Sequence, residues 1–293
     1  MDTARLASVA LMLAAMTLIP LGDAAGKLLT EGHGIAPLFV AFVRFAVGAV
    51  VVAAILGERP DWRLARDGRV WLRAGLIAGG IACILTALRT APFADVFAAF
   101  FVGPVVSYVL SVRLLGERVR PAQSVLLAVG FAGVLLVVRP GFGMAPGLGW
   151  ALAAGACYGG FLTASRWLGG IARPRQLMLS QTAMGTVLLA VPGLWVAPEA
   201  AALIQPVNAA LLLGSGLASA AGNLLLILAY RRAAATVLAP FVYFQLIAAT
   251  TLGWLVFDTL PGPAGLAGLS ILVAAGFGGL LLRPLPPAGA ARP

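Results

Sequence analysis

Residues 37–56 read Pro37-Leu-Phe-Val-Ala-Phe-Val-Arg-Phe-Ala-Val-Gly-Ala-Val-Val-Val-Ala-Ala-Ile-Leu56, an apolar stretch that carries a single charge, Arg44. A lipid bilayer offers the backbone no hydrogen-bond partner, so a segment that crosses it is either an α-helix or a strand of a closed barrel. A membrane-spanning strand alternates polar and apolar residues, whereas a membrane-spanning helix is an unbroken apolar run of about 20 residues. Pro37–Leu56 therefore predicts a transmembrane helix.

Most of the chain repeats this pattern. Of the 293 residues, 61% are hydrophobic and 10% are charged, and the mean hydropathy is +1.01. The longest predicted loop, Gly57–Arg69, is too short to bury a core of its own, which excludes a water-soluble domain. We therefore predict an all-α integral membrane protein with ten transmembrane helices. The expected spans are Leu6–Leu29, Pro37–Leu56, Val70–Leu88, Asp95–Leu115, Pro121–Val138, Gly147–Leu168, Gln176–Val196, Asn208–Tyr230, Thr236–Phe257 and Ala264–Leu282.

The basic residues are distributed unevenly over the loops. In a soluble protein, a net charge of +10 and an isoelectric point of about 11.1 would suggest a nucleic-acid partner. If the N-terminus is cytoplasmic, sixteen of the 20 basic residues fall on the cytoplasmic side, three on the other side, and Arg44 inside a helix. This is the positive-inside bias of membrane proteins. We therefore expect a multi-pass inner (plasma) membrane protein with both termini in the cytoplasm, in contact with the lipid bilayer and with no nucleic acid.

The two halves of the chain resemble each other. A proline, a polar residue and a glycine near the start of the second helix recur at the same spacing near the start of the seventh. We predict two repeats of five helices, residues 1–140 and residues 141–293, the second with a short cytoplasmic C-terminal tail. Because five is odd, the halves enter the membrane from opposite sides, an inverted-topology repeat typical of transporters with a midplane site. The matching residues are Pro37, Arg44 and Gly48 in the first half and Pro174, Gln181 and Gly185 in the second.

Several short motifs have the pattern of a known transporter family. They are Pro20-Leu-Gly-Asp-Ala-Ala-Gly-Lys27, Phe42-Val-Arg44-Phe45, Pro104 with Leu114-Leu-Gly-Glu117-Arg118, and Val129-Gly-Phe-Ala-Gly-Val-Leu-Leu-Val-Val138. On these motifs the chain resembles the drug/metabolite transporter (DMT) superfamily, with two EamA-type repeats over residues 5–284, and within it the YddG-type amino-acid exporters. The second repeat departs from the family pattern, because Phe257-Asp258 stands where Gly-Glu is usual. The resemblance implies ten helices, cytoplasmic termini and a central cavity.

Three charged residues lie within the first two predicted helices. Asp23 and Lys27 are four residues apart, which places them on one helical face at pairing distance. Arg44, in the outer half of the next helix, is within reach of Asp23. Charges inside a membrane are costly and by default mark functional sites. Two interpretations stay open: a gate or substrate-carboxylate contact at the periplasmic mouth, and a structural charge cluster that joins the two helices.

Five polar, aromatic or small residues are predicted to lie near the middle of the membrane. At a rise of about 1.5 Å per residue, Gly79, Tyr158 and Tyr243 lie about 10–17 Å into their spans. Gln245 is close to Tyr243, and Asn223 lies somewhat nearer the cytoplasm. Hydroxyl and amide groups can bond a polar ligand, and glycine leaves room for a bulky one. As a set these residues are expected to line a substrate cavity, although each taken alone also fits a structural position.

An aromatic stripe follows helical spacing along the fourth predicted helix. Phe97, Phe101 and Tyr108 share one face of that helix with Pro104. Such a stripe usually packs against neighbouring helices or lipid. In a carrier for aromatic or large apolar amino acids it would instead form the wall of the pocket. Both interpretations stay open, and the three aromatic residues join the expected substrate-binding set.

The chemistry that an enzyme needs is missing from this sequence. With one histidine, no clustered carboxylates and no nucleophile–base pair, no catalytic residues, metal site or cofactor are expected. The favoured hypothesis is an exporter of small amphipathic metabolites, neutral or aromatic amino acids, that works by alternating access around a midplane cavity. Alternatives are a DMT carrier for another cargo (a nucleoside, drug or sugar derivative) and a receptor or scaffold that transports nothing. The expected partner is a small-molecule substrate, an amino acid or similar metabolite, and the sequence leaves the oligomeric state open, with a monomer among the alternatives.

Overall fold

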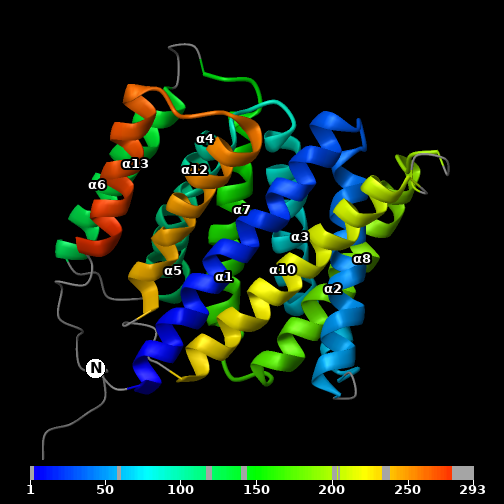
Figure 1. The fold of residues 1–293 in the computed structure, drawn as a ribbon. Helices are drawn as coiled ribbons and strands as arrows, with labels where there is room; N and C mark the ends of the chain where they lie inside the picture. Colours follow the sequence, from blue (N-terminus) through cyan, green and yellow to red (C-terminus); the bar gives the residue numbers. More distant parts are fainter. Residues whose placement is uncertain are drawn as a thin grey trace, which may run out of the picture.

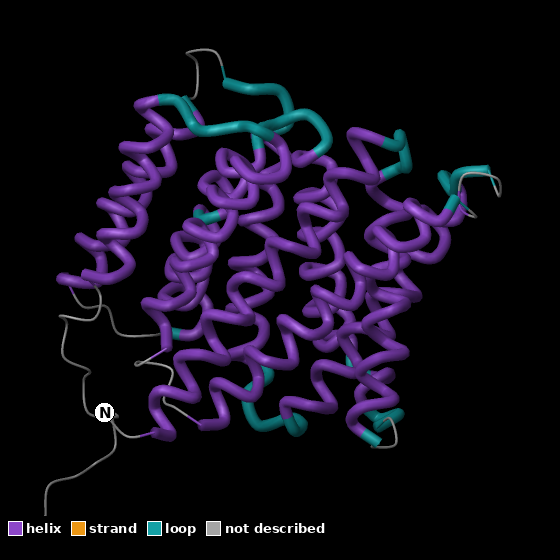
Figure 2. The backbone as a smooth tube through the Cα atoms, in the orientation of Figure 1, coloured by secondary structure: helices purple, strands orange, loops and turns teal. Residues whose placement is uncertain are grey.

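The structure is a computed structural model that describes residues 3–57, 61–116, 121–139, 144–199, 203, 205–232 and 238–278. Within these ranges the regular elements are all helices, as Figure 2 shows, and ten helical spans are counted. The prediction of an all-α membrane protein with ten spans is therefore confirmed. Two residues of the sequence motifs, Glu117 and Arg118, lie outside the described residues.

Most predicted spans coincide with one helix of the structure. Two of them, α2 (Pro37–Leu56) and α6 (Pro121–Val138), have the predicted limits, because a proline suits the first position of a helix. Gly57 ends α2 in the left-handed conformation, which glycine adopts at little cost. The other undivided helices and their flanking turns are α1 (Thr3–Lys27) with the π-helical turn η1 (Leu28–Gly32), the 3-10 turn η2 (Leu64–Arg66), α3 (Gly68–Leu88), α7 (Leu148–Trp167), α8 (Pro174–Trp195), α10 (Pro206–Arg232) and α13 (Pro263–Gly278).

The fourth span is divided in the structure, although one continuous helix was predicted over Asp95–Leu115. It consists of α4 (Phe93–Phe100) and α5 (Val102–Leu115), which meet at Phe101. Pro104 explains the break, because proline lacks the N–H that would bond the carbonyl four residues earlier, and its ring clashes with that carbonyl. The break frees backbone groups in the middle of the span.

The ninth span, predicted as Thr236–Phe257, is divided at the corresponding place. In the described residues it begins with the 3-10 turn η3 (Ala239–Tyr243) and continues as α12 (Phe244–Phe257). Pro20 has no such effect, because α1 runs through it as one helix. The fourth and ninth spans are therefore two-part elements at matching positions in the two halves.

Helices of the two halves pair symmetrically, where the counterpart of a helix is the span five places along the chain. α1 packs along α10, and their counterparts α7 and α3 pack along each other. α2 packs against α8, α6 against α13 and α4 against α12, so each of these helices contacts its own counterpart. In Figure 1, α1 rises from the lower face and α7 descends from the upper one, as an inverted-topology repeat requires. The repeat boundary at residues 140/141 lies outside the described residues.

We call the face on which α1 begins the N-terminal face and the other the opposite face. At one side of the molecule, α6 and α13 form a close pair (Figure 1). A Cβ on Gly133 would lie 2.7 Å from the carbonyl oxygen of Gly268, and a Cβ on Gly268 would lie 2.6 Å from that of Gly133. Only residues without side chains allow backbones to approach so closely.

The outer surface of the bundle is apolar, as a bilayer requires. Val50, Val191 and Leu255 lie within helices and are exposed, Val191 by 76%. Trp150 and Trp195 are exposed near helix ends, where aromatic residues meet the membrane–water interface. In the described part of the chain, six helices are long and apolar enough to cross a membrane, and shorter apolar helices accompany them. The fold is that of a multi-span helical membrane protein.

Candidate functional site

A buried ion pair lies toward the opposite face, where α1, α2 and α10 meet. Asp23 is 2% exposed and Arg44 is 6% exposed. The Arg44 guanidinium donates one hydrogen bond to Oδ1 of Asp23 and another to Oγ of Ser219. A charge is tolerated in such a place only when it is paired and hydrogen-bonded, and Arg44 is both. We call Asp23, Arg44 and Ser219 the Arg44 clamp.

The four-residue spacing predicted that Lys27 can pair with Asp23, but in the structure Lys27 has other partners. Its Nζ donates to the carbonyl oxygens of Leu88 and Ala91, at 2.6 and 3.1 Å, and lies 2.7 Å from the carboxylate of Glu31. Asp23 is already bonded to Arg44, and the end of α3 presents carbonyls that lack helical donors. Lys27 therefore joins the ends of α1 and α3 and is not part of the Arg44 clamp.

Arg73, counted in the sequence among the cytoplasmic basic residues, is buried in the bundle near the N-terminal face. It is 8% exposed; its Nε donates to Oγ of Ser165 at 2.8 Å, and its Nη1 donates to the carbonyl oxygen of Leu177 at 3.2 Å. Its guanidinium carbon lies 4.5 Å from the centre of the Phe161 ring, a cation–π contact. The sequence signal that could have identified Arg73 is its position inside the predicted span Val70–Leu88, since most of the other basic residues lie in loops. We call Arg73, Ser165 and the Leu177 carbonyl the Arg73 clamp.

The two clamps are related by the exchange of the two halves. The Arg44 clamp joins α1, α2 and α10. The Arg73 clamp joins α7, α8 and α3, which are the counterparts of those three helices. The arginine comes from α2 in one clamp and from α3 in the other, so the helices match although the residues do not. Toward each face, an arginine thus ties together one of two counterpart sets of three helices.

Aromatic rings gather at the breaks in the two-part spans. Phe101, at the α4–α5 break, lies with its ring centroid 5.1 Å from that of Tyr243, at the end of η3. Next to it, Phe100 packs against Tyr158 of α7 at 5.0 Å, and Tyr158 lies 6.0 Å from Phe161. The rings of Phe100 and Phe101 are 6.4 Å apart, so the five rings form a continuous row at favourable separations. The structure therefore brings together three predicted cavity residues, Phe101, Tyr158 and Tyr243, in what we call the aromatic row.

The predicted stripe along the fourth span does not form one wall. Phe97 is fully buried against Phe93, with the ring centroids 5.0 Å apart. The hydroxyl of Tyr108 instead shares a hydrogen bond with Oγ of Ser124 in α6, at 2.6 Å. The break at Phe101 explains the difference, because it ends the regular helical spacing on which the stripe was predicted. Of its members, Phe101 alone belongs to the aromatic row.

The remaining predicted cavity residues lie on separate helices. A Cβ on Gly79 would lie 3.9 Å from Sγ of Cys157, which places this glycine in the contact between α3 and α7. Nδ2 of Asn223 donates to the carbonyl oxygen of Ser219 at 2.9 Å, one turn earlier in α10. Gln245 is buried near the start of α12. The sequence placed these residues at similar depths, but it could not tell which way each side chain points.

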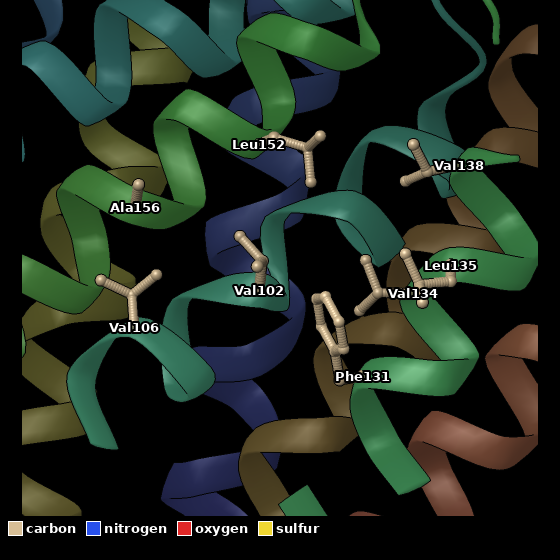
Figure 3. Close-up of a pocket in the computed structure, with 8 residues that line it drawn as sticks. All are labelled: Val102, Val106, Phe131, Val134, Leu135, Val138, Leu152 and Ala156. Carbon is tan, nitrogen blue, oxygen red and sulfur yellow. The ribbon is translucent and has the colours of Figure 1, made fainter. Parts of the chain in front are cut away.

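Two cavities are described, and neither is lined by a predicted cavity residue. The larger holds about 300 Å³ and is a crevice between α5, α6 and α7, shown in Figure 3. Phe131 and Leu135 at its rim are exposed, so it opens toward lipid. Since every side chain that lines it is apolar, it fits an apolar chain and offers nothing to orient a polar cargo. The lining residues are Val102, Val106, Phe131, Val134, Leu135, Val138, Leu152 and Ala156.

The smaller cavity holds about 200 Å³ and lies at the opposite face, where ends of α4, α6, α7 and α13 meet. Two opposite charges line it: Asp95, in the first turn of α4, and Arg139, directly after α6. The other lining residues are aliphatic or glycine, and they are Val137, Val138, Ala145, Leu148, Gly262 and Gly265.

Known proteins resemble this chain in sequence and in fold. Residues 6–139 match the EamA-like transporter family. A riboflavin transporter of Rhizobium johnstonii is 29% identical over 211 residues, which cover 69% of this chain and 67% of the relative. The pseudopaline exporter CntI of Pseudomonas aeruginosa is 26% identical over 245 residues, which cover 80% and 83%. A riboflavin transporter of Brucella anthropi is 24% identical over 272 residues, which cover 83% and 87%.

A solved crystal structure shares the fold, with a TM-score of 0.57 and 21% sequence identity over 90% of this chain and 94% of the other. At that identity the likeness concerns the fold alone. The family match and the named relatives bear on the activity as well. With an EamA-like domain over residues 6–139 and such relatives over most of its length, the chain belongs to the drug/metabolite transporter superfamily and is a membrane transporter.

Proposed function

We propose that this transporter exports small amphipathic metabolites, above all neutral or aromatic amino acids, across the inner membrane by alternating access. The observation that carries the proposal is the presence of equivalent arginine clamps toward opposite faces. Alternating access requires one face to open while the other stays closed. Two latches that hold counterpart sets of helices supply these two closures.

The central passage is proposed to follow the aromatic row. Phe101 and Tyr243 lie at the breaks in the fourth and ninth spans, where a helix lacks its regular hydrogen bonds and bends most easily. Tyr158 contributes from α7, which the Arg73 clamp holds to α3 and α8. When a clamp opens, these rings can give up their contacts with one another and contact a cargo instead. Phe101, Tyr158 and Tyr243 are therefore the core of the proposed substrate-binding set.

An aromatic amino acid fits the groups that the row presents. Its side chain can replace a partner ring at the same separation, and the hydroxyls of Tyr158 and Tyr243 can bond its polar end. Export is the proposed direction because one relative is named an exporter.

A flavin is the second candidate cargo. Two relatives are named riboflavin transporters. The aromatic row supports this candidate, because five neighbouring rings offer more aromatic surface than one amino-acid side chain can contact.

Counterflow in proteoliposomes tests both candidates. Vesicles that contain the full-length protein are loaded with unlabelled L-phenylalanine and placed in labelled L-phenylalanine. We expect transient accumulation of label, inhibited by L-tryptophan and unaffected by riboflavin. If riboflavin inhibits and L-tryptophan does not, and if riboflavin itself shows counterflow, the cargo belongs to the flavin class. Absence of counterflow with every one of these compounds would contradict the proposed function.

A further inference from the structure

The smaller cavity is lined by two charged residues that have no role in the proposed alternating-access mechanism. Asp95 and Arg139 line it at the opposite face, and none of its lining residues belongs to the aromatic row. Among the described residues, neither Asp95 nor Arg139 forms an ion pair, although both line the same cavity. A carboxylate and a guanidinium thus share one compartment without being bonded to each other.

The backbone at Arg139 is unusual for an arginine. Its φ is +48°, in the left-handed region that residues with a side chain rarely adopt. Glycine would end α6 in this conformation without strain. Asp258 ends α12 in the same conformation, with a φ of +49°, so this geometry closes both helices at the opposite face. At the end of α6, the residue that adopts it lines the smaller cavity.

Two glycines of the cavity wall, Gly262 and Gly265, leave space beside Asp95. A Cβ on Gly265 would be in ordinary contact with Oδ1 of Asp95 at 3.6 Å, and a Cβ on Gly262 would meet nothing within 4 Å. The opposite wall is aliphatic, with buried Leu148 and half-buried Ala145 among its residues. One compartment of about 200 Å³ therefore combines an anion, a cation and an apolar wall.

We propose that this cavity is a second binding site, separate from the central passage, for a free zwitterionic amino acid with an aliphatic side chain. The Asp95 carboxylate accepts hydrogen bonds from the α-ammonium group, and the Arg139 guanidinium donates to the α-carboxylate. The aliphatic wall receives the side chain. A phosphoethanolamine headgroup carries the same pair of charges and is the competing occupant.

Calorimetry on the full-length protein in phosphatidylglycerol nanodiscs tests the site without any transport. L-leucine is expected to bind saturably. N-acetyl-L-leucine lacks the ammonium group and L-leucinamide lacks the carboxylate, so each should bind about tenfold more weakly or worse, as for loss of one charge-assisted hydrogen bond. Equal binding of all three compounds, or no binding of L-leucine, would overturn the proposal even before any variant is made.

Variants then locate the binding. Asp95→Asn should weaken L-leucine about tenfold and leave N-acetyl-L-leucine unchanged, while Arg139→Gln should weaken L-leucine and leave L-leucinamide unchanged. Ala145→Phe, which fills the cavity, should abolish L-leucine binding. Arg89→Gln and Asp258→Asn are matched controls, because these exposed charges end α3 and α12 near the same face, outside the cavity. L-leucine binding that survives in an Asp95→Asn/Arg139→Gln double variant would overturn the assignment.

Two further arms separate the alternatives. Loss of L-leucine binding in phosphatidylethanolamine nanodiscs, with competition by glycerophosphoethanolamine, would assign the site to a lipid headgroup and overturn the amino-acid proposal. Tyr158→Ala should leave this binding intact while it impairs counterflow. Binding without any counterflow would contradict the proposed export function alone, whereas counterflow without this binding would contradict the second site alone.

Discussion

Arg44 shows how a membrane protein accommodates a buried charge. Its guanidinium has several donors in one plane, so it can bond a carboxylate on α1 and a hydroxyl on α10 at the same time. Water does not compete for these bonds, because both Asp23 and Arg44 are buried. The same burial makes the arrangement vulnerable, since removal of one partner leaves the other charge without compensation.

Arg44→Gln should therefore destabilise the protein strongly. Breaking a buried pair from one side costs about 3–5 kcal/mol, whereas an exposed pair contributes about 0–1 kcal/mol. Arg44→Lys should restore little, because one ammonium group cannot reproduce the fork that reaches both partners. Thermal denaturation followed by size-exclusion chromatography in detergent measures the effect. Arg69→Gln is the matched control, since Arg69 pairs with Asp67 at 2.7 Å on the surface. Equal melting temperatures for Arg44→Gln and Arg69→Gln would contradict this account of the clamp.

The aromatic row yields a prediction about transport. Tyr158→Ala and Tyr243→Ala should each reduce the rate of counterflow more than Trp195→Ala. The two tyrosines pack within the row, whereas Trp195 is 88% exposed at the end of α8 and contributes only to the lipid interface. Initial rates at matched protein incorporation provide the comparison. Similar losses in all three variants would remove the row from the cargo path.

The sequence alone could predict some of these contacts and not others. The positions of Asp23 and Arg44 in adjacent spans predicted that they lie within reach. The partner of Lys27 was predicted wrongly, because helical spacing shows which residues share a face but not which carbonyls the neighbouring helix presents. Arg73 was missed because a basic residue one turn inside a span looks like a topology signal until the helices around it are known.

At the scale of helices, composition sets the spans and proline sets their interruptions. Long apolar runs located the spans, with limits reproduced for α2 and α6. The breaks in the fourth and ninth spans were not predicted, although Pro104 was visible in the sequence. A proline does not always break a membrane helix, because neighbouring groups can satisfy the freed carbonyl. α1, which continues through Pro20, is the example in this chain.

The glycine contact between α6 and α13 can be tested with a single methyl group. Gly268→Ala should destabilise the protein, because the added Cβ would lie 2.6 Å from the backbone oxygen of Gly133, and neither backbone can move away without separating the helices. Gly214→Ala in α10 is the matched control, since a Cβ there meets nothing within 4 Å. It should be neutral or stabilise by up to about 1 kcal/mol through helix propensity. Melting temperatures in detergent decide, and a Gly268→Ala protein as stable as Gly214→Ala would show that the two helices are not in contact.

At the scale of the whole molecule, a count of five helices per half already implied an inverted repeat. It did not reveal which helices pair across the halves, because every span is apolar on its surface and many partners are compatible with that. The observed pairing of α1 with α10 and of α3 with α7 is what places counterpart helices in the two clamps. The clamps are thus a property of the assembled repeat, and no local motif encodes them.

If the clamps are latches, losing each one should open a different face. Arg73→Gln should favour access from the N-terminal face, and Arg44→Gln, or the milder Ser219→Ala, should favour access from the opposite face. Native Cys83 and Cys157 can report this without further changes, because both are free, half-buried thiols inside α3 and α7. A membrane-impermeant thiol reagent is added to vesicles of known orientation, on one side at a time.

The expected result is labelling from opposite sides in the two classes of variant, with little labelling of the unmodified protein from either side. The physical reason is that each arginine bonds three helices near one face only, so its loss removes lateral restraint there and leaves the other clamp closed. Arg69→Gln, which touches neither clamp, should label like the unmodified protein. If both classes of variant label from the same side, the clamps are structural braces in one rigid bundle. The alternation between faces would then have to arise elsewhere, for which the breaks in the fourth and ninth spans are the remaining hinges.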